Sequence, residues 1–356
     1  MVEILTNQEK AVNKLRSLYL SYGYLSYKMS KFEEYDLYAT NKDFLVSDRV
    51  ITFTDTDGKL LALKPDVTLS ILKNAVEGEK QKVYYNENVY RVSGNTSDFK
   101  EIMQSGIECI GEVDLYDKYE VIMLAVKSLN LIGGDYLLNL SHLGILTEIL
   151  SGCDEKFKSH IIKHLSQKNA QGVKNACQIY GREDLAEVLG EISTLYGTIE
   201  SVTKKLKSLG ISGKAIDELN SLNELLCQTE FYDKIRVDLS LTGDMRYYNG
   251  LVFKGYISGV SGGILSGGEY GLLAKKMGKN CSAIGFAVYI DLLENYNFQA
   301  SASDVDILII YDEKTDIKRL INAINDITNS GKSVRAQKSV GKIRSKEILD
   351  LSGGAK

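Results

Sequence analysis

The sequence predicts an α+β fold in which helices flank an antiparallel sheet, a helical insertion interrupts that body, and a short α/β domain follows it. Strand-like alternation occurs on both sides of residues 154–223, a stretch with helical periodicity that no strand alternation interrupts. A buried strand followed by an amphipathic helix begins at residue 305. These observations place a main domain at residues 1–153 and 224–295, a helical insertion at 154–223 and a C-terminal domain at 304–356.

The main domain is expected to begin with a helix that Gly23 ends, because apolar residues recur at helical spacing before that glycine. A second helix is expected at residues 114–131, where an apolar face carrying Ile122 and Val126 is suited to cover a sheet. Short alternating or apolar runs predict the strands of the sheet, at Val50–Thr54, Leu60–Leu63, Lys82–Tyr85, Tyr136–Ser141 and Lys234–Leu241.

The C-terminal domain is expected to follow a linker at residues 295–303. Its predicted elements are a buried strand at Val305–Tyr311, an amphipathic helix at Lys314–Asn329 and a second strand at Ser333–Gln337. An α/β unit this short buries little apolar area, so we expect it to pack on the main body or on a partner.

Composition favours a cytoplasmic protein without a membrane segment. The five cysteines lack CxxC spacing, which favours reduced thiols over a disulfide frame or a zinc site. No apolar stretch approaches the ~20 residues of a membrane helix, and the first residues lack the apolar core of a signal peptide. His160 and His164 have i, i+4 spacing, but their neighbours favour an ordinary helix face, so no metal site is expected.

Overall charge gives little support for nucleic-acid binding. The net charge of the 356-residue chain is −4 and its pI is about 5.6, whereas a tRNA-binding enzyme usually presents a basic face. One local run, residues 332–346, contains six Lys or Arg residues and no acid. We interpret this run as a solvated edge of the small C-terminal domain.

The most informative segment runs from Asn88 to Gly111, NVYRVSGNTSDFKEIMQSGIECIG. An apolar and aromatic run ends in Arg91, a polar loop follows, and the next residues alternate as a strand. Gln104 and Glu108 then project from one face of that strand, about 13–14 Å apart. Polar side chains on an otherwise apolar strand need partners that offset their desolvation, so the pair predicts one pocket, with a solvated sheet face as the alternative.

Three other segments complete a recognisable order. The segment LLALKPDVT, residues 60–68, holds the only proline of the chain, and DMRYYNGLVF, residues 244–253, and GGEYGLL, residues 267–273, follow downstream. In order and spacing, these segments resemble the catalytic domain of histidyl-tRNA synthetase, a class II aminoacyl-tRNA synthetase. The tetrad SYGY at Ser21–Tyr24 fits the opening of that domain, and the resemblance covers roughly residues 8–295.

The resemblance implies a pocket for histidine. Asp66, Thr68 and Gln104 would face the α-ammonium group, where each charge-assisted hydrogen bond contributes roughly 1.5–3 kcal/mol. Glu108 and Tyr248 would face the imidazole, which needs an acceptor at each N–H group. Asp66 departs from the family, in which a longer glutamate stands. The histidine-binding residues expected from the family are Asp66, Thr68, Arg91, Gln104, Glu108, Tyr247 and Tyr248.

The chain departs further from the family where ATP is held. Arg91 keeps the arginine of motif 2, but Leu292 stands at the arginine of motif 3 and Gly243 at the histidine-specific arginine. Arg246 is near Gly243 in the sequence, yet three residues along a strand put it on the opposite face. Each missing arginine would cost on the order of 3 kcal/mol in the transition state, so we expect no aminoacylation, no catalytic residue and no cofactor.

A kept amino-acid pocket, lost activation arginines and a truncated anticodon-binding-like domain together resemble the ATP phosphoribosyltransferase regulatory subunit family. The resemblance implies a non-catalytic subunit that activates a short catalytic subunit and takes part in feedback inhibition by histidine. It also implies a homodimer within a hetero-oligomer, without nucleic acid as a partner. An active histidyl-tRNA synthetase and a histidine-sensing or tRNA-binding adaptor are the alternatives. The sequence leaves open whether histidine occupies this pocket or a subunit interface.

Overall fold

The computed structural model describes residues 5–45, 49–92, 98–243, 245, 247–294, 296 and 303–353. The chain divides after Tyr296 into a large compact unit, which begins at Gln8, and a small unit that contains the C-terminal residues. Most of the expected linker, along with Asp244 and Arg246, lies outside the residues that the structure describes. None of the described helices is long and apolar enough to cross a membrane.

A nine-stranded sheet forms the frame of the large unit, in the order β1-β5-β6-β12-β11-β10-β7-β9-β8. Neighbouring strands are antiparallel except in the pairs β1–β5 and β7–β9. The mostly antiparallel sheet confirms the predicted α+β class. The strands are β1 (Leu25–Ser26), β5 (Gln81–Val92), β6 (Phe99–Gly111), β7 (Tyr136–His142), β8 (Tyr196–Gly197), β9 (Ile235–Asp238), β10 (Leu251–Ile257), β11 (Leu265–Glu269) and β12 (Ser282–Tyr289).

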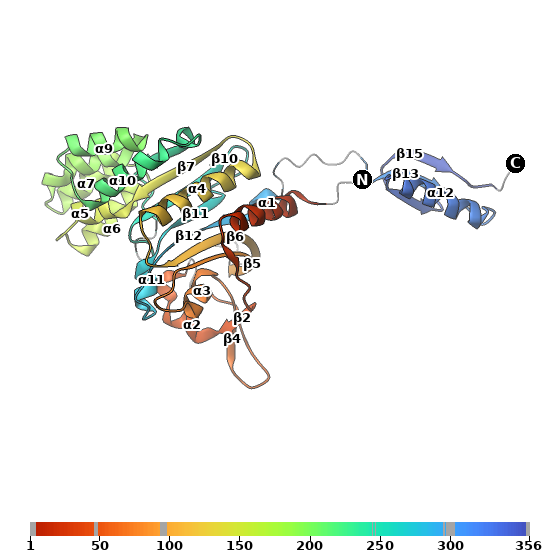
Figure 1. The fold of residues 1–356 in the computed structure, drawn as a ribbon, viewed down its shortest axis with the longest axis horizontal. Helices are drawn as coiled ribbons and strands as arrows, with labels where there is room; N and C mark the ends of the chain where they lie inside the picture. Colours follow the sequence, from red (N-terminus) through yellow and green to blue (C-terminus); the bar gives the residue numbers. More distant parts are fainter. Residues whose placement is uncertain are drawn as a thin grey trace. The chain divides into compact units, whose positions relative to one another are not determined.

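Two long helices, α1 (Asn7–Ser21) and α4 (Leu115–Ile132), cover one face of this sheet (Figure 1). A capping box starts α4, because the Asp114 side chain accepts from the backbone N–H of Asp117 and the Asp117 side chain accepts from that of Asp114. Both helices were predicted from apolar periodicity, and the apolar side of each packs in the main core with side chains of β6, β7, β10 and β12.

The opposite face of the sheet carries a second core, in which Tyr85, Val89 and Ile110 of the sheet pack against shorter elements. A three-stranded sheet of order β2-β4-β3 belongs to this layer. The elements are β2 (Phe32–Glu34), α2 (Tyr35–Thr40), η1 (Lys42–Phe44), β3 (Thr52–Thr54), β4 (Leu60–Leu63), α3 (Thr68–Asn74) and α11 (Gly271–Lys276). The strand predicted at Leu60–Leu63 is therefore confirmed, and the one predicted at Val50–Thr54 is two residues shorter.

β5 and β6 form a long hairpin with twelve paired residues on each strand. The sequence pattern suggested a short strand at Lys82–Tyr85 and a separate apolar run ending at Arg91, but one continuous strand spans both. The polar residues between them, such as Glu87, are tolerated because the strand is only partly buried there. The hairpin positions the two sides of the pocket described below.

The chain segment that connects β7 to β9 is mostly helical, and its helices lie together at one end of the large sheet (Figure 1). Their apolar residues join the main core without a break. The expectation that no strand interrupts this helical stretch is wrong, because Tyr196 and Gly197 pair with β9 at the sheet edge. The elements are α5 (Leu143–Ile149), α6 (Glu155–Ser166), α7 (Ala170–Ile179), η2 (Glu183–Leu185), α8 (Ala186–Thr194), α9 (Ile199–Ser208), α10 (Lys214–Leu226) and η3 (Tyr232–Lys234).

The small unit is a three-stranded parallel sheet of order β14-β13-β15 with one helix. Its core contains Ile307, Ile309 and Leu320. The third strand, β15, was not predicted, because its sequence SKEILD mixes charged and apolar residues without clear alternation. The elements are β13 (Val305–Ile310), α12 (Ile317–Asn329), β14 (Val334–Gln337) and β15 (Ser345–Asp350).

Candidate functional site

A pocket of about 80 Å³ opens on the second face of the large sheet, between β6, β12 and the start of α3. The structure brings all of the predicted histidine-binding residues to its wall, although they come from four separate segments of the chain. These residues are Asp66, Thr68, Arg91, Gln104, Glu108, Tyr247 and Tyr248.

Strand β6 supplies two of the pocket's polar side chains. Gln104 and Glu108 are 3% and 2% exposed, so neither lies on a solvated sheet face. Both line the pocket because they are four residues apart on one face of the strand. On the neighbouring strand β12, Gln104 is opposite Tyr289 and Glu108 is opposite Gly285.

Glu108 is held by two hydroxyl groups. The Thr68 hydroxyl donates to Glu108 Oε1 at 2.8 Å, and the Tyr270 hydroxyl donates to Oε2. Burial raises the pKa of Glu108 to about 8, although both hydroxyl donors act in the opposite direction. A Cβ atom at Gly285 would collide with this carboxylate, so the glycine creates the room in which Glu108 lies.

Asp66 and Arg91 lie side by side at another part of the wall. Asp66 Oδ1 accepts from the backbone N–H of Leu69 at 2.9 Å in the first turn of α3, and Asp66 Oδ2 is 3.8 Å from Arg91 Nη2. Burial raises the pKa of Asp66 above its ordinary value, and the charge of Arg91 partly offsets this rise. Arg91 Nε donates to the carbonyl of Pro65 at 2.8 Å, which ties the guanidinium to the loop before α3.

Gln104 is the unusual member of the set. Its side chain is only 3% exposed and lies in the pocket wall, and its amide makes no hydrogen bond with any residue that the structure describes. Because Gln104 lines the pocket, its amide is free to bond with whatever occupies that space. An amide without a protein partner at this place is therefore available to a ligand.

Aromatic rings close the rest of the pocket. The Tyr247 ring lies 4.7 Å from the Tyr248 ring and 5.9 Å from the Tyr270 ring, between centroids. Tyr85 and Tyr289 also line the wall. Burial raises the pKa of Tyr85, Tyr247, Tyr248 and Tyr270, so all four hydroxyls remain protonated donors at neutral pH.

Positive charge is scarce around this pocket. Arg91 is the one cationic side chain among the described residues of its wall. Leu292 is 38% exposed in η4 (Ile290–Leu293), and Gly243 has a φ of +57°. Neither residue offers a donor that would replace an arginine.

Tyr270 and Gly285 contribute to the pocket, although the sequence pattern gave no role to either. Tyr270 belongs to the segment 267–273 on which the family resemblance rests, and that was the available signal. The need for glycine at 285 depends on its register opposite Glu108, which only the pairing of β6 with β12 shows.

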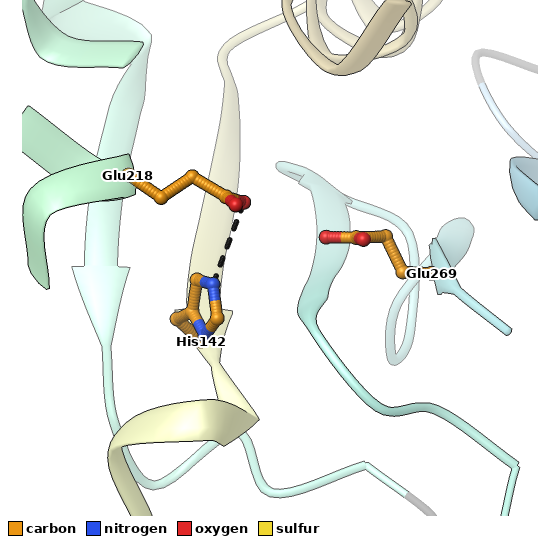
Figure 2. Close-up of side chains that lie close together, drawn as sticks. All are labelled: His142, Glu218 and Glu269. Atoms are coloured by element: carbon orange, nitrogen blue, oxygen red, sulfur yellow. Dashed lines mark ion pairs between the residues drawn. The ribbon is translucent and has the colours of Figure 1, made fainter. Parts of the chain in front are cut away.

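A second polar cluster lies close to the pocket in the chain, because Glu269 ends β11 just before Tyr270. His142, Glu218 and Glu269 place one ligand atom each within 4.8 Å of one another (Figure 2). Lys118 of α4 contacts both carboxylates: its Nζ is 2.8 Å from each carboxylate oxygen of Glu218 and 3.1 Å from Glu269 Oε2.

Other contacts complete this cluster. His142 Nε2 is 3.4 Å from Glu218 Oε1, while Nδ1 accepts from the backbone N–H of Gly144 at 3.1 Å. Glu269 Oε1 accepts from the backbone N–H of Leu251 at 2.9 Å. Because a lysine ammonium bridges the two carboxylates, the arrangement is that of a structural ion network that joins α4, α10, β7 and β11.

The basic run of the small unit is partly neutralised. Lys338 pairs with Glu313, Arg344 with Asp304 and Lys346 with Asp306, at 3.4, 2.8 and 2.7 Å. Three of the six basic residues in this run therefore face an acid, which favours a solvated edge over a nucleic-acid surface.

Comparison with known proteins shows which family the large unit resembles. The family described as histidyl-tRNA synthetase matches residues 3–293. An ATP phosphoribosyltransferase regulatory subunit from Ruminiclostridium cellulolyticum is 27% identical, over 86% of this chain and 77% of that protein.

Two solved structures share the fold. An ATP phosphoribosyltransferase regulatory subunit/histidyl-tRNA synthetase from Bacillus halodurans has a TM-score of 0.76 at 22% identity, covering 100% of this chain and 97% of that one. A chain of the ATP phosphoribosyl transferase (HisG:HisZ) complex from Thermotoga maritima has a TM-score of 0.63 at 20% identity, covering 80% and 97%. With a matched family that spans most of its length, this chain belongs to the histidyl-tRNA synthetase family.

Proposed function

We propose that this chain is a non-catalytic regulatory subunit of ATP phosphoribosyltransferase. In this role it activates a short catalytic chain and takes part in feedback inhibition by histidine. The name of the Ruminiclostridium relative supports the role, and the Thermotoga complex supports a catalytic chain as partner. We propose a cytoplasmic location as well, in keeping with five cysteines that are all free thiols.

One observation carries the proposal: the pocket keeps the groups that recognise an amino acid, but the described residues of its wall include a single cation. ATP activation needs several positive groups around the phosphates and the developing negative charge, each contributing on the order of 3 kcal/mol. Leu292 and Gly243 provide none, and Arg91 alone cannot replace them. We therefore infer a protein that binds an amino acid and does not activate it.

Histidine is the ligand that we assign to the pocket. Its imidazole would lie between Glu108 and Tyr248, and its ammonium near Asp66, Thr68 and Gln104. The unpartnered amide of Gln104 supports this placement, because its oxygen would accept from an ammonium.

Feedback requires only that histidine bind one arrangement of the assembly better than another. A difference of about 1–3 kcal/mol is typical of allosteric coupling. We propose a homodimer as the core of that assembly. Its support is exposed apolar surface: Leu25 is 70% exposed in β1, the edge strand of the large sheet, and Leu20 in α1 is 50% exposed.

The deciding experiment is co-purification with a short catalytic chain of ATP phosphoribosyltransferase, followed by rate measurements with and without histidine. We expect a stable complex, a higher rate than the catalytic chain alone, and inhibition by histidine only when both chains are present. The isolated chain should give no histidine-dependent pyrophosphate exchange. Measurable exchange would show an active synthetase and refute the non-catalytic role.

A further inference from the structure

Strand β15 of the small unit is an edge strand whose outer side is open. It pairs with β13 on one side, and none of the described residues forms a strand on its other side. Its last five residues are all exposed, and the side chains of Ile348 and Leu349 are 54% and 38% exposed. An edge strand presents unpaired N–H and C=O groups, to which a further strand can be added.

The small unit has few buried side chains that could offset this exposed edge. Its apolar core consists of Ile307, Ile309, Leu320 and Leu351. A unit with so small a core gains stability when it covers apolar surface on a partner. A strand added beside β15 would cover the exposed side chain of Ile348 and satisfy the open backbone groups.

The charges of β15 are placed symmetrically around Ile348. In the sheet, Ile348 lies beside Leu308 of β13. Because side chains alternate along a strand, Lys346 and Asp350 point to the same face as Ile348. Lys346 Nζ is 2.7 Å from Asp306 Oδ1, yet the lysine side chain remains 66% exposed. This face therefore carries a positive charge two residues before Ile348 and a negative charge two residues after it.

This spacing makes β15 complementary to a second copy of itself. When two copies pair antiparallel about a two-fold axis at Ile348, Lys346 of each copy stands opposite Asp350 of the other. The two Ile348 side chains meet on the axis. Parallel pairing would place like charges opposite each other, and a shift by one residue would remove both opposite-charge pairs. Charged residues on an edge strand disfavour most pairings, and here they favour this one.

We propose that β15 pairs antiparallel with β15 of a second copy of this chain, with Ile348 on the two-fold axis. The contact joins two three-stranded sheets into one continuous sheet and is the same surface on both copies. It does not depend on what the pocket binds. It is also separate from the apolar surface of Leu20 and Leu25 in the large unit.

Disulfide trapping in the full chain tests the contact at one residue. In Ile348→Cys the two new thiols lie on the axis, where the Cα atoms of opposed residues are about 4.5–5.5 Å apart, a separation that a disulfide spans. Mild oxidation should therefore link two copies through residue 348, as identified by mass spectrometry of the linked peptide.

Asn325→Cys is the matched control, because Asn325 is an exposed residue of α12 in the same unit. Its linkage of residue 325 to itself should stay at the level of the background that the exposed Cys227 gives in the wild type. A thermal unfolding curve for each variant establishes that it is folded at the temperature of the oxidation.

Charge reversal in the Ile348→Cys background tests the register. Lys346→Glu and Asp350→Lys each place like charges opposite each other, so each should slow the linkage by at least roughly fivefold. The double variant restores opposite charges across the axis and should recover the rate. Because the double variant does not restore the pair with Asp306 inside one copy, recovery reports the contact between copies.

Three results would overturn the proposal. The first is an Ile348→Cys linkage no greater than that of Asn325→Cys. The second is a double variant that links as slowly as the single reversals. The third is linkage of residue 348 to Cys227 in place of a second residue 348, since another segment would then occupy the edge.

Discussion

Two buried polar clusters meet at the end of β11, and they differ in whether their charges have partners. In the cluster around Lys118, burial would lower the pKa of the lysine, but Glu269 and Glu218 raise it above its ordinary value. Burial likewise would raise the pKa of Glu218, but His142 and Lys118 hold it below its ordinary value. The protein itself therefore stabilises the charges of Lys118 and Glu218.

The pocket, which contains Tyr270 directly after Glu269, shows the opposite pattern: its charged groups lack sufficient partners in the protein. Burial raises the pKa of Glu108 and of Asp66, so the folded chain disfavours both carboxylates. Gln104 has no partner among the described residues, and Arg91 is only half satisfied. A polar network whose members all have protein partners stabilises the fold, whereas a network with unpaired groups can form further hydrogen bonds with a ligand.

The largest expected difference between the clusters is in pH dependence. The pKa of Glu108 rises from 4.5 in the unfolded chain to about 8 in the folded one. A raised pKa means that its stabilising contribution is fully present below pH 4.5 and is lost as the pH rises through about 8. Glu108→Gln should therefore gain stability relative to the wild type between pH 5 and pH 8, by roughly 4 kcal/mol at about 1.4 kcal/mol per unit.

Urea unfolding at pH 5, 7 and 9 without ligand measures this effect. Glu218→Gln is the matched control, because a lowered pKa gives stability that is present above the unfolded value and is lost only in acid. Its difference from the wild type should stay constant between pH 7 and pH 9. Equal pH profiles for the two variants would contradict the distinction between the clusters.

Removing the cation of the satisfied cluster should have the next largest effect. Lys118→Met leaves Glu218 and Glu269 facing each other without a positive group, which should lower the free energy of unfolding by about 3 kcal/mol. Chemical denaturation measures it, and Lys118→Arg should retain most of the stability. A loss below about 1 kcal/mol would show that water screens this network as at an open surface.

A third expectation concerns binding. Glu108→Gln should weaken histidine binding by roughly 30-fold, or about 2 kcal/mol, because a bound imidazolium favours ionisation of the Glu108 carboxyl, whereas the amide cannot ionise. Glu218→Gln should bind histidine as the wild type does, since Glu218 lies outside the pocket wall. Titration calorimetry at pH 7 decides it, and equal affinity of Glu108→Gln and wild type would place the ligand elsewhere.

The smallest effect is expected at Gln104. Gln104→Met keeps the shape of the side chain and removes an amide that has no partner among the described residues, so stability should change by less than about 1 kcal/mol. Histidine affinity should fall by roughly five- to tenfold, because the ammonium loses one acceptor. Thermal unfolding and calorimetry on the same sample test both effects; a loss of stability above about 1 kcal/mol would show that the amide has a partner in the folded chain.

The sequence was sufficient for features that depend on local pattern. Alternation along residues 102–109 placed Gln104 and Glu108 on one strand face, and helical periodicity identified α1 and α4. It was insufficient for β15, whose mixed composition hides its pairing with β13, and for the length of β5. Pairing with a distant strand decides such elements, and local pattern does not record it.

For the pocket, the order of segments by itself determined which residue types are present: two acids, an amide, three or more tyrosines and one arginine, with Leu292 and Gly243 where cations would stand. Only the tertiary structure decided their partners. Tyr270 reaches Glu108 across 162 positions of the chain, and Lys118 reaches Glu218 across 100. Burial and hydrogen-bond partners arise when distant segments pack together, so the folded chain alone separates an amide without a partner from a lysine with two.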